Sequence, residues 1–160
     1  MEYLLAQLDG KQLDLIYRMT RDGATLNDFH SRCDNQGPTV TLFKTSSGRS
    51  CGGYVSESWD SPPGGCGYWK EDYSAFLISF DAQQRFDVSR PDEAIYCDMG
   101  LGPWFGDCLL SAHEPFNEES KCLSLARMRD QYEIADEDNE SLLTGEDYFT
   151  AEEIEVFRVV

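Results

Sequence analysis

The sequence predicts a mostly β protein of the α+β class, a two-sheet antiparallel β-sandwich with a few short peripheral helices. Many short segments are rich in β-branched and aromatic residues, turns with Gly or Pro separate them, and only one or two patterns are helical. Strands do not alternate with long helices, which argues against a parallel α/β sheet. A chain of 160 residues without a visible repeat fits a single domain over residues 1–160.

Helical signals are confined to the N-terminal part of the chain. Closely spaced apolar residues predict a short amphipathic helix over residues 3–8, and alternation over Leu13–Arg18 predicts a strand. Residues 21–23 are predicted to form a turn. Thr25 is followed three positions later by an acid, close to a capping box. This pattern predicts a helix of about ten residues, which Gly37 and the following proline end.

The rest of the chain is predicted to be almost entirely β. Thr39–Lys44 and Cys51–Val55 form the arms of a hairpin around a Ser-Ser-Gly turn. The segment 56–73 contains Gly, Pro and Trp residues and is predicted to be a long loop. Further strands are predicted at residues 75–80, 85–88, 94–97, 108–111 and 154–160, with turns at 100–106 and 150–153.

The charge balance restricts the expected partners. Lys and Arg number 13 against 30 Asp and Glu, which gives a net charge of −17 at pH 7. Like charges repel, so neither nucleic acid nor an anionic membrane surface is an expected partner. No apolar run exceeds four residues, whereas a spanning helix needs about 20, so no membrane insertion is expected. The N-terminal residues have no basic, apolar pattern of a secretory signal.

The six cysteines are expected to be reduced thiols that act as small core residues, because the chain is large enough to fold without disulfides. They are Cys33, Cys51, Cys66, Cys97, Cys108 and Cys122. No CxxC pair is present, which argues against a zinc ribbon or a thioredoxin-like site.

Two patterns resemble those of nucleophilic catalysis. His30 and Cys33 share one face of a predicted helix, so they could form a nucleophilic pair or half of a metal site. A core cysteine beside a half-buried histidine is the simpler interpretation. Residues 48–52 have the GxSxG spacing of a nucleophile elbow around Ser50, but the strand-turn-helix context is missing. A glycine-rich hairpin turn is therefore favoured there.

The C-terminal part of the chain is strongly acidic. Asp136, Asp138 and Glu140 alternate, and Asp147 is at the twelfth position, a spacing similar to that of a calcium loop. The sixth position is not Gly and no helix pair flanks the segment, so a solvated acidic loop is favoured. Residues 130–157 hold eleven acids and no Lys or Arg, a charge that could steer a basic partner.

Four stretches of sequence, in order, carry a resemblance to a known family. They are Leu15-Ile16-Tyr17-Arg18 with Arg21-Asp22-Gly23, Phe29-His30-x-x-Cys33-Asp34 with Gly37-Pro38-Thr39, Gly52-Gly53-Tyr54-Val55-Ser56, and Glu153-Ile154-Glu155-Val156-Phe157. Ala75-Phe76-Leu77 and Phe105-Gly106-Asp107 lie between them. With these pieces in order, essentially the whole chain resembles a TLDc domain.

The resemblance implies a non-catalytic protein-interaction and regulatory module. Such a module is expected to bind a large protein assembly, the vacuolar proton-pumping ATPase, to promote its disassembly, and to be linked to oxidative-stress resistance. The implied location is the cytoplasm, at the cytosolic face of an acidic organelle. No cofactor, metal or small-molecule substrate is expected. Two alternatives stay open: a structural subunit of a larger assembly, and a thiol or hydrolase enzyme that uses Ser50, His30 or a cysteine.

The family's motif positions fall on Gly23, Thr25, Gly52, Gly106 and Glu155, each with a structural interpretation beside a role in binding. Gly23 is expected to take a positive φ before the helix that Thr25 caps. Gly52 permits a close strand approach or a bulge, and Gly106 fits a turn. If Glu155 faces inward, its carboxylate needs donors, which we expect from backbone amides or a hydroxyl near Gly23 and Thr25.

Overall fold

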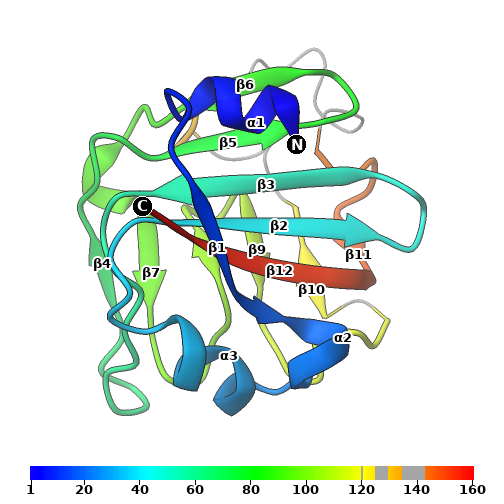
Figure 1. The fold of residues 1–160 in the computed structure, drawn as a ribbon. Helices are drawn as coiled ribbons and strands as arrows, with labels where there is room; N and C mark the ends of the chain where they lie inside the picture. The colour runs from blue at the N-terminus through cyan, green and yellow to red at the C-terminus, as the bar shows by residue number, and fades with distance from the viewer. Residues whose placement is uncertain (120, 125–129, 135–142) are drawn as a thin grey trace.

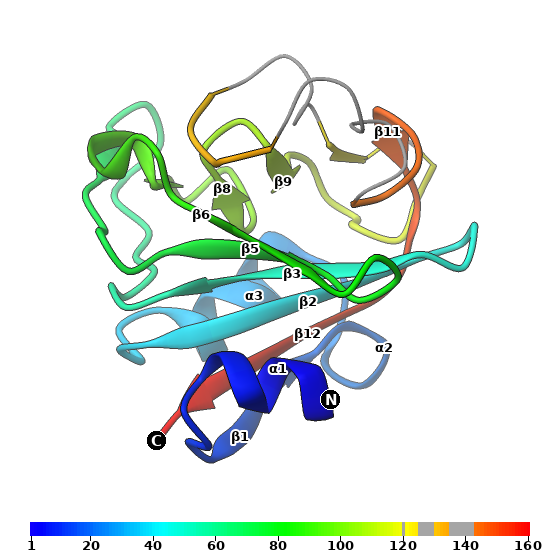
Figure 2. The ribbon, with the colours of Figure 1, turned by 90° about the horizontal axis from the view of Figure 1, so that it is seen from above.

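The computed structural model describes residues 1–119, 121–124, 130–134 and 143–160. In these residues the chain forms two antiparallel sheets of six strands each. The sheets stack face to face, with the second sheet above the first in Figure 2. The predicted antiparallel sandwich with short helices is confirmed. No helix in the described part of the chain is long and apolar enough to cross a membrane.

The first sheet joins the two ends of the sequence (Figure 1). Its strands, in spatial order, are β1 (Leu13–Arg18), β12 (Ala151–Val159), β2 (Thr39–Thr45), β3 (Ser50–Val55), β5 (Phe76–Ser79) and β6 (Gln84–Asp87). The C-terminal strand β12 therefore lies between β1 and β2. The predicted turn over 150–153 is wrong from residue 151 onward, because Ala151 pairs with Thr45 and Glu153 with Lys44 across a bulge. These pairings extend β12 through the two acids that suggested a turn.

The second sheet is built from shorter strands. Its order is β11 (Tyr148–Phe149), β10 (Cys122–Leu123), β9 (Leu109–Ser111), β8 (Trp104–Phe105), β7 (Ile95–Cys97) and β4 (Tyr68–Lys70). Strand β4 lies in the predicted loop 56–73, and β8 lies in the predicted turn 100–106. A strand of two or three residues shows no alternation, so these strands are defined by their pairing, β4 with the more distant β7 and β8 with the neighbouring β9.

The helices lie at the periphery of the first sheet. They are α1 (Glu2–Gln7), α2 (Met19–Asp22) and α3 (Leu26–Cys33), whereas a 3₁₀ turn, η1 (Pro91–Glu93), lies next to β4 of the second sheet. The two predicted helices are present as α1 and α3. The predicted turn at 21–23 instead includes the end of α2, a single helical turn in which the Gly23 amide donates to the Met19 carbonyl at 3.0 Å.

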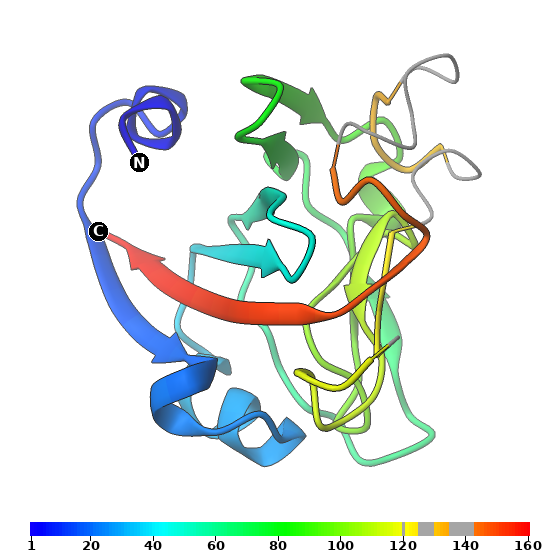
Figure 3. The same cartoon turned by 90° about the vertical axis from the view of Figure 1, so that its right-hand side faces the viewer.

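Two hydrophobic clusters cover the two faces of the first sheet. The main cluster lies between the sheets and includes the buried aromatic side chains of Tyr17, Phe29, Phe43, Trp59 and Phe105. The second cluster lies on the outer face, under α1, and contains Leu4, Leu8, Val40, Tyr54, Phe76, Ile78 and Val159. Figure 3 shows α1 on the side of the first sheet that faces away from the second sheet. Because α1 has only six residues, it covers part of this outer face.

Candidate functional site

Glu155 lies on the outer face of the first sheet. Its strand neighbours Ile154 and Val156 are fully buried in the main core, so alternation turns the Glu155 side chain outward. Register pairs Glu155 with Arg18 of β1. The Arg18 Nε donates to Glu155 Oε1 at 2.7 Å, and Nη2 lies at 2.7 Å from the same oxygen. Glu155 therefore does not face inward, and its partner is a guanidinium.

Glu153 lies two residues before Glu155 on β12 and ties this strand to α2. Its Oε1 accepts hydrogen bonds from the backbone amides of Thr20 and Ile154, each at 3.1 Å, and the Thr20 hydroxyl donates to Oε2. Glu153 thus has neutral donors as its partners in the described structure. This role of Glu153 was missed in the sequence analysis, because a turn was predicted at this position. The spacing of Glu153, Glu155 and Phe157 is nonetheless typical of side chains on one face of a strand.

Asp22 contacts three arginine residues in the region of these two acids. Its carboxylate accepts from the Arg18 amide at 2.9 Å and from Arg21 Nη2 at 2.7 Å, and Arg32 Nε lies 3.6 Å away. The hydrogen bond from the Arg21 guanidinium lowers the pKa of Asp22 to about 2. Asp22 is therefore ionised at neutral pH.

Gly23 and Thr25 shape the connection from α2 to α3. Gly23 has a φ of 112°, and a Cβ there would overlap the Asp28 carboxylate. That carboxylate belongs to a complete capping box: the Asp28 amide donates to Thr25 Oγ1 at 3.2 Å, and the Thr25 amide donates to Asp28 Oδ2 at 3.1 Å. The expected positive φ at Gly23 and the cap at Thr25 are confirmed.

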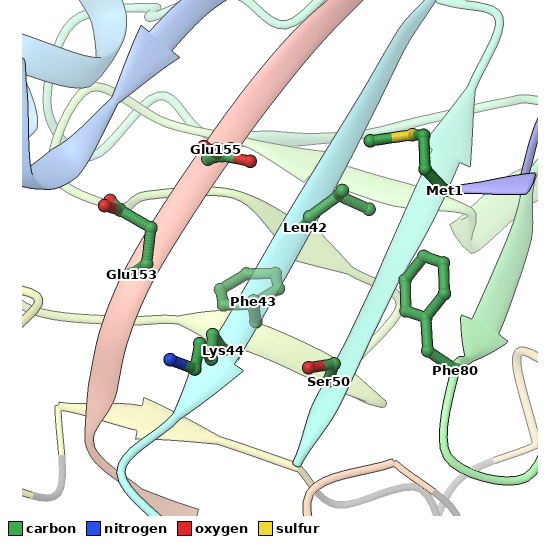
Figure 4. Close-up of a pocket in the computed structure, with 8 residues that line it drawn as sticks. All are labelled: Met1, Leu42, Phe43, Lys44, Ser50, Phe80, Glu153 and Glu155. Carbon is green, nitrogen blue, oxygen red and sulfur yellow. The ribbon is translucent and has the colours of Figure 1, made fainter. Parts of the chain in front are cut away.

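An open groove of about 420 Å³ lies next to the two acids on the outer face (Figure 4). Its lining residues are Met1, Leu42, Phe43, Lys44, Ser50, Phe80, Glu153 and Glu155. Leu42 and Phe80 are partly buried apolar side chains that pack against the outer cluster. The groove therefore combines an apolar floor with an acidic edge on β12.

Gly52 leaves β3 without a side chain on the outer face at this point of the sheet. It pairs with Leu42 on one side and Ile78 on the other, without a register shift, so it allows a close approach and not a bulge. A Cβ on Gly52 would overlap the Thr41 carbonyl oxygen and lie 2.9 Å from Leu42 Cδ2. Leu42 can thus lean across the glycine.

Gly106 belongs to a different part of the molecule. It has a φ of 46° between β8 and β9, and an added Cβ would lie 2.6 Å from the Gln131 Cβ. The expected turn is confirmed. The structure therefore places Gly52 opposite Leu42, on the same sheet face as Glu155, whereas Gly23 and Thr25 lie in the connection from α2 to α3 and Gly106 lies between two strands of the second sheet.

The candidate nucleophiles are not arranged as a catalytic site in the described residues. His30 Nδ1 lies 2.9 Å from Asp34 Oδ1 and its Nε2 lies 2.8 Å from the Leu101 carbonyl oxygen, so both ring nitrogens face acceptors other than Cys33. Burial raises the pKa of the Cys33 thiol, which disfavours the thiolate nucleophile. Ser50 begins β3 in a hairpin, and its amide donates to Asp81 Oδ2 at 2.8 Å.

The remaining cysteines and acids give no metal-ligand set in the described part of the chain. All six cysteines lie within it and are free thiols, five of them buried and Cys66 exposed. Of the four acids with calcium-loop spacing, Asp136, Asp138 and Glu140 lie outside the described residues, so the calcium-loop interpretation stays a prediction.

Comparison with known proteins agrees with this fold. The family model described as TLDc domain matches residues 1–160, the whole chain. Comparison with the curated proteins gives no match.

Proposed function

The chain belongs to the TLDc domain family, and from this premise we propose that it is a non-catalytic regulatory module that binds a large protein assembly, the vacuolar proton-pumping ATPase. Membership of the family indicates a regulatory protein of the oxidation-resistance type. The proposed location, the cytoplasm at the cytosolic face of an acidic organelle, follows from that partner.

The observation that carries the proposal is the position of Glu155. A motif glutamate on a core-facing position would have a structural role, but Glu155 lies on an outer face, with 22% of its side chain exposed and an apolar groove beside it. Apolar surface combined with charged residues at its edge is typical of protein-binding sites. The net charge of −17 favours basic surfaces on the partner.

The enzyme alternative finds less support in the geometry. Catalytic cysteines are partly exposed and have a lowered pKa, whereas burial raises the pKa of Cys97 and Cys122 to about 11 and that of Cys108 to about 12. No hydrogen bond in the described structure joins Cys33 or Ser50 to a histidine. A hydrolase built on these residues would need a different arrangement of its base.

Sedimentation with purified membranes tests the proposal. Membranes that carry the assembled ATPase are incubated with the protein, pelleted, and assayed for bound protein and for ATP-driven acidification. We expect the protein to pellet with the membranes, acidification to fall, and the peripheral sector to appear in the supernatant. Membranes stripped of the peripheral sector are the control. Equal binding to both membranes, with acidification unchanged, would contradict the proposal.

The same experiment separates a regulator from a structural subunit. A regulator should dissociate when the pellet is washed and should be absent from part of the assemblies. A permanent subunit should stay in a fixed ratio to the other subunits through the washes. We expect the first behaviour, because the sandwich has a closed core of its own between its two sheets.

A further inference from the structure

We propose that the outer-face groove binds a short, basic amphipathic segment of a partner protein, with apolar side chains on its floor and a Lys or Arg at Glu153 and Glu155. The inference rests on the proposed interaction function, since it names the surface that is used and the chemistry that this surface takes. Four features of the outer face support it: the extent of the apolar floor, the glycine beside it, its charge and its length.

The apolar floor continues beyond the groove of Figure 4. A second hollow of about 530 Å³ is lined by the apolar side chains of Met1, Leu5, Leu13 and Phe157 and by Gly10, Lys11 and Gln12, and Met1 lines both hollows. Phe157 is two residues after Glu155 on β12, so it lies on the same face of the strand. The two hollows therefore lie along the outer face of β12.

Two features leave this floor open. Helix α1 has six residues, and of its side chains only Leu4, with Leu8 just after the helix, belongs to the buried outer cluster. Gly52 contributes no side chain, so nothing rises from β3 between Leu42 and Ile78. The result is an apolar depression on a sheet face that a longer helix or a bulky β3 residue would fill.

The charge of the edge favours a cation. Glu155 shares its carboxylate with Arg18, but Glu153 accepts hydrogen bonds from neutral groups in the described structure. Lys44, the one Lys or Arg among the lining residues of the groove in Figure 4, is itself 3.0 Å from Glu152, and Lys11 lines the second hollow. The edge therefore keeps a negative charge, and the net charge of −17 repels acidic segments. A basic residue offers the charge complement that the edge lacks.

The length of the site fits a short segment. Strand residues rise about 3.3 Å each, so the distance from Glu153 to Phe157 is roughly 13 Å. That distance accommodates about four residues of extended chain or about two turns of helix. Glu155 lies opposite Leu42 on β2 and two residues before Phe157 on β12, so a cation at Glu155 has apolar neighbours both across and along the strand.

Titration of the isotope-labelled protein with synthetic peptides tests the inference by NMR. The probe is a peptide of about ten residues in which short groups of Leu alternate with short groups of Lys, and it is long enough to span the site. One control peptide replaces each Lys by Glu and another replaces each Leu by Ser. We expect shift changes at Leu42, Phe80 and Phe157 with the first peptide only. Equal affinity for the Glu or Ser peptide, or shifts centred elsewhere, would overturn the inference.

Two substitutions with the same charge change locate the site. Ser50→Arg places bulk and a cation in the groove, whereas Ser31→Arg places the same cation on the exposed side of α3. We expect Ser50→Arg to weaken peptide binding about tenfold or more, and Ser31→Arg to change it less than about twofold. If both variants weaken peptide binding equally, net charge and not the groove determines the binding, which would contradict the inference. Phe80→Ala repeats the test if Ser50→Arg does not fold.

The outcome separates this inference from the proposed function. If the peptide binds in the groove but the protein does not pellet with ATPase membranes, the partner is wrong and the groove inference stands. If the protein pellets with those membranes but the peptide does not bind, the groove inference is wrong and the proposed partner stands.

Discussion

Arg18 and Glu155 face each other across the β1–β12 pair on the outer face of the first sheet, with Arg18 Nη2 2.7 Å from Glu155 Oε1. A second acid–arginine pair, Asp14 and Arg158, joins the same two strands with a separation of 3.0 Å. The two pairs differ in their surroundings, because only Glu155 lines the groove. Asp14 is thus a matched control for Glu155.

The first prediction is that Glu155→Gln leaves the protein nearly as stable as the wild type. The Arg18 side chain is 43% exposed and the Glu155 side chain 22%, and ion pairs at the surface contribute about 0.2–1 kcal/mol. We expect Glu155→Gln and Asp14→Asn to lower the free energy of unfolding by similar amounts, each under about 1 kcal/mol. Urea denaturation of both variants measures this. A much larger loss for Glu155→Gln would indicate a structural role.

Gly23 provides a prediction on stability. Gly23→Ala forces an alanine into a φ of 112° and brings its Cβ into the Asp28 carboxylate, which disrupts the capping box. Gly10→Ala is the control, because Gly10 also has a positive φ but no atom within 4 Å of an added Cβ. We expect Gly23→Ala to cost about 1–3 kcal/mol more than Gly10→Ala by chemical denaturation. Equal losses would show that the capping box contributes little.

The surroundings of His30 lead to a prediction about how the stability of the protein depends on pH. Burial alone lowers the pKa of His30, but hydrogen bonds to Asp34 and the Leu101 carbonyl, with the Asp34 charge, outweigh it, so the pKa is raised above 6.5. Asp98 is a further contributor that raises it. A raised folded-state pKa means that protonation stabilises the fold below pH 6.5 and that this contribution is lost as the pH rises through the folded-state value.

The measurement compares the wild type with His30→Gln. The difference in their free energies of unfolding should be largest near pH 6 and should shrink toward pH 8. NMR titration of the His30 ring should show a midpoint above that of a model peptide. A difference that grows with pH, or a midpoint below 6.5, would contradict the assigned hydrogen bonds.

The burial of the cysteines leads to a prediction about which thiols react. Burial raises the pKa of the Cys51 and Cys108 thiols and shields them, whereas Cys66 is exposed. Under native conditions we expect one thiol per chain to react rapidly with a disulfide reagent, and Cys66→Ser to remove that reaction. After denaturation without reductant, all six cysteines should react. Fewer than six would reveal a disulfide, and several fast thiols in the native protein would contradict the burial.

Local signals in the sequence were sufficient for part of the fold. The β-branched run of β2 and the turn after it predict the β2–β3 hairpin within a residue or two. The acid three residues after Thr25 predicts the cap of α3. Strands β8 and β10 were missed, because each has two residues, too few to show alternation. Strand β8 also lies in a stretch rich in Gly that suggested a turn, and β10 pairs on one side with the distant β11.

The site was less predictable than the fold. The family resemblance identified Glu155, but its orientation depended on which face of β12 the second sheet covers. Arg18 and Glu155 are 137 positions apart, and Thr20 and Glu153 are 133 apart, so no local pattern could pair them. The groove was missed because it combines side chains of β2, β3 and β12 with Met1, which precedes α1, and Phe80, which follows β5.

The central claim is that the face bearing Glu155 is where the protein binds its partner. Sedimentation of Glu155→Gln and Asp14→Asn with membranes carrying the proton-pumping ATPase tests it most directly, because the variants remove equal charge from two acid–arginine pairs that join the same two strands. With both variants folded, we predict that Glu155→Gln loses most of its membrane-bound fraction and that Asp14→Asn keeps the wild-type fraction. Equal binding of the two variants would contradict the claim.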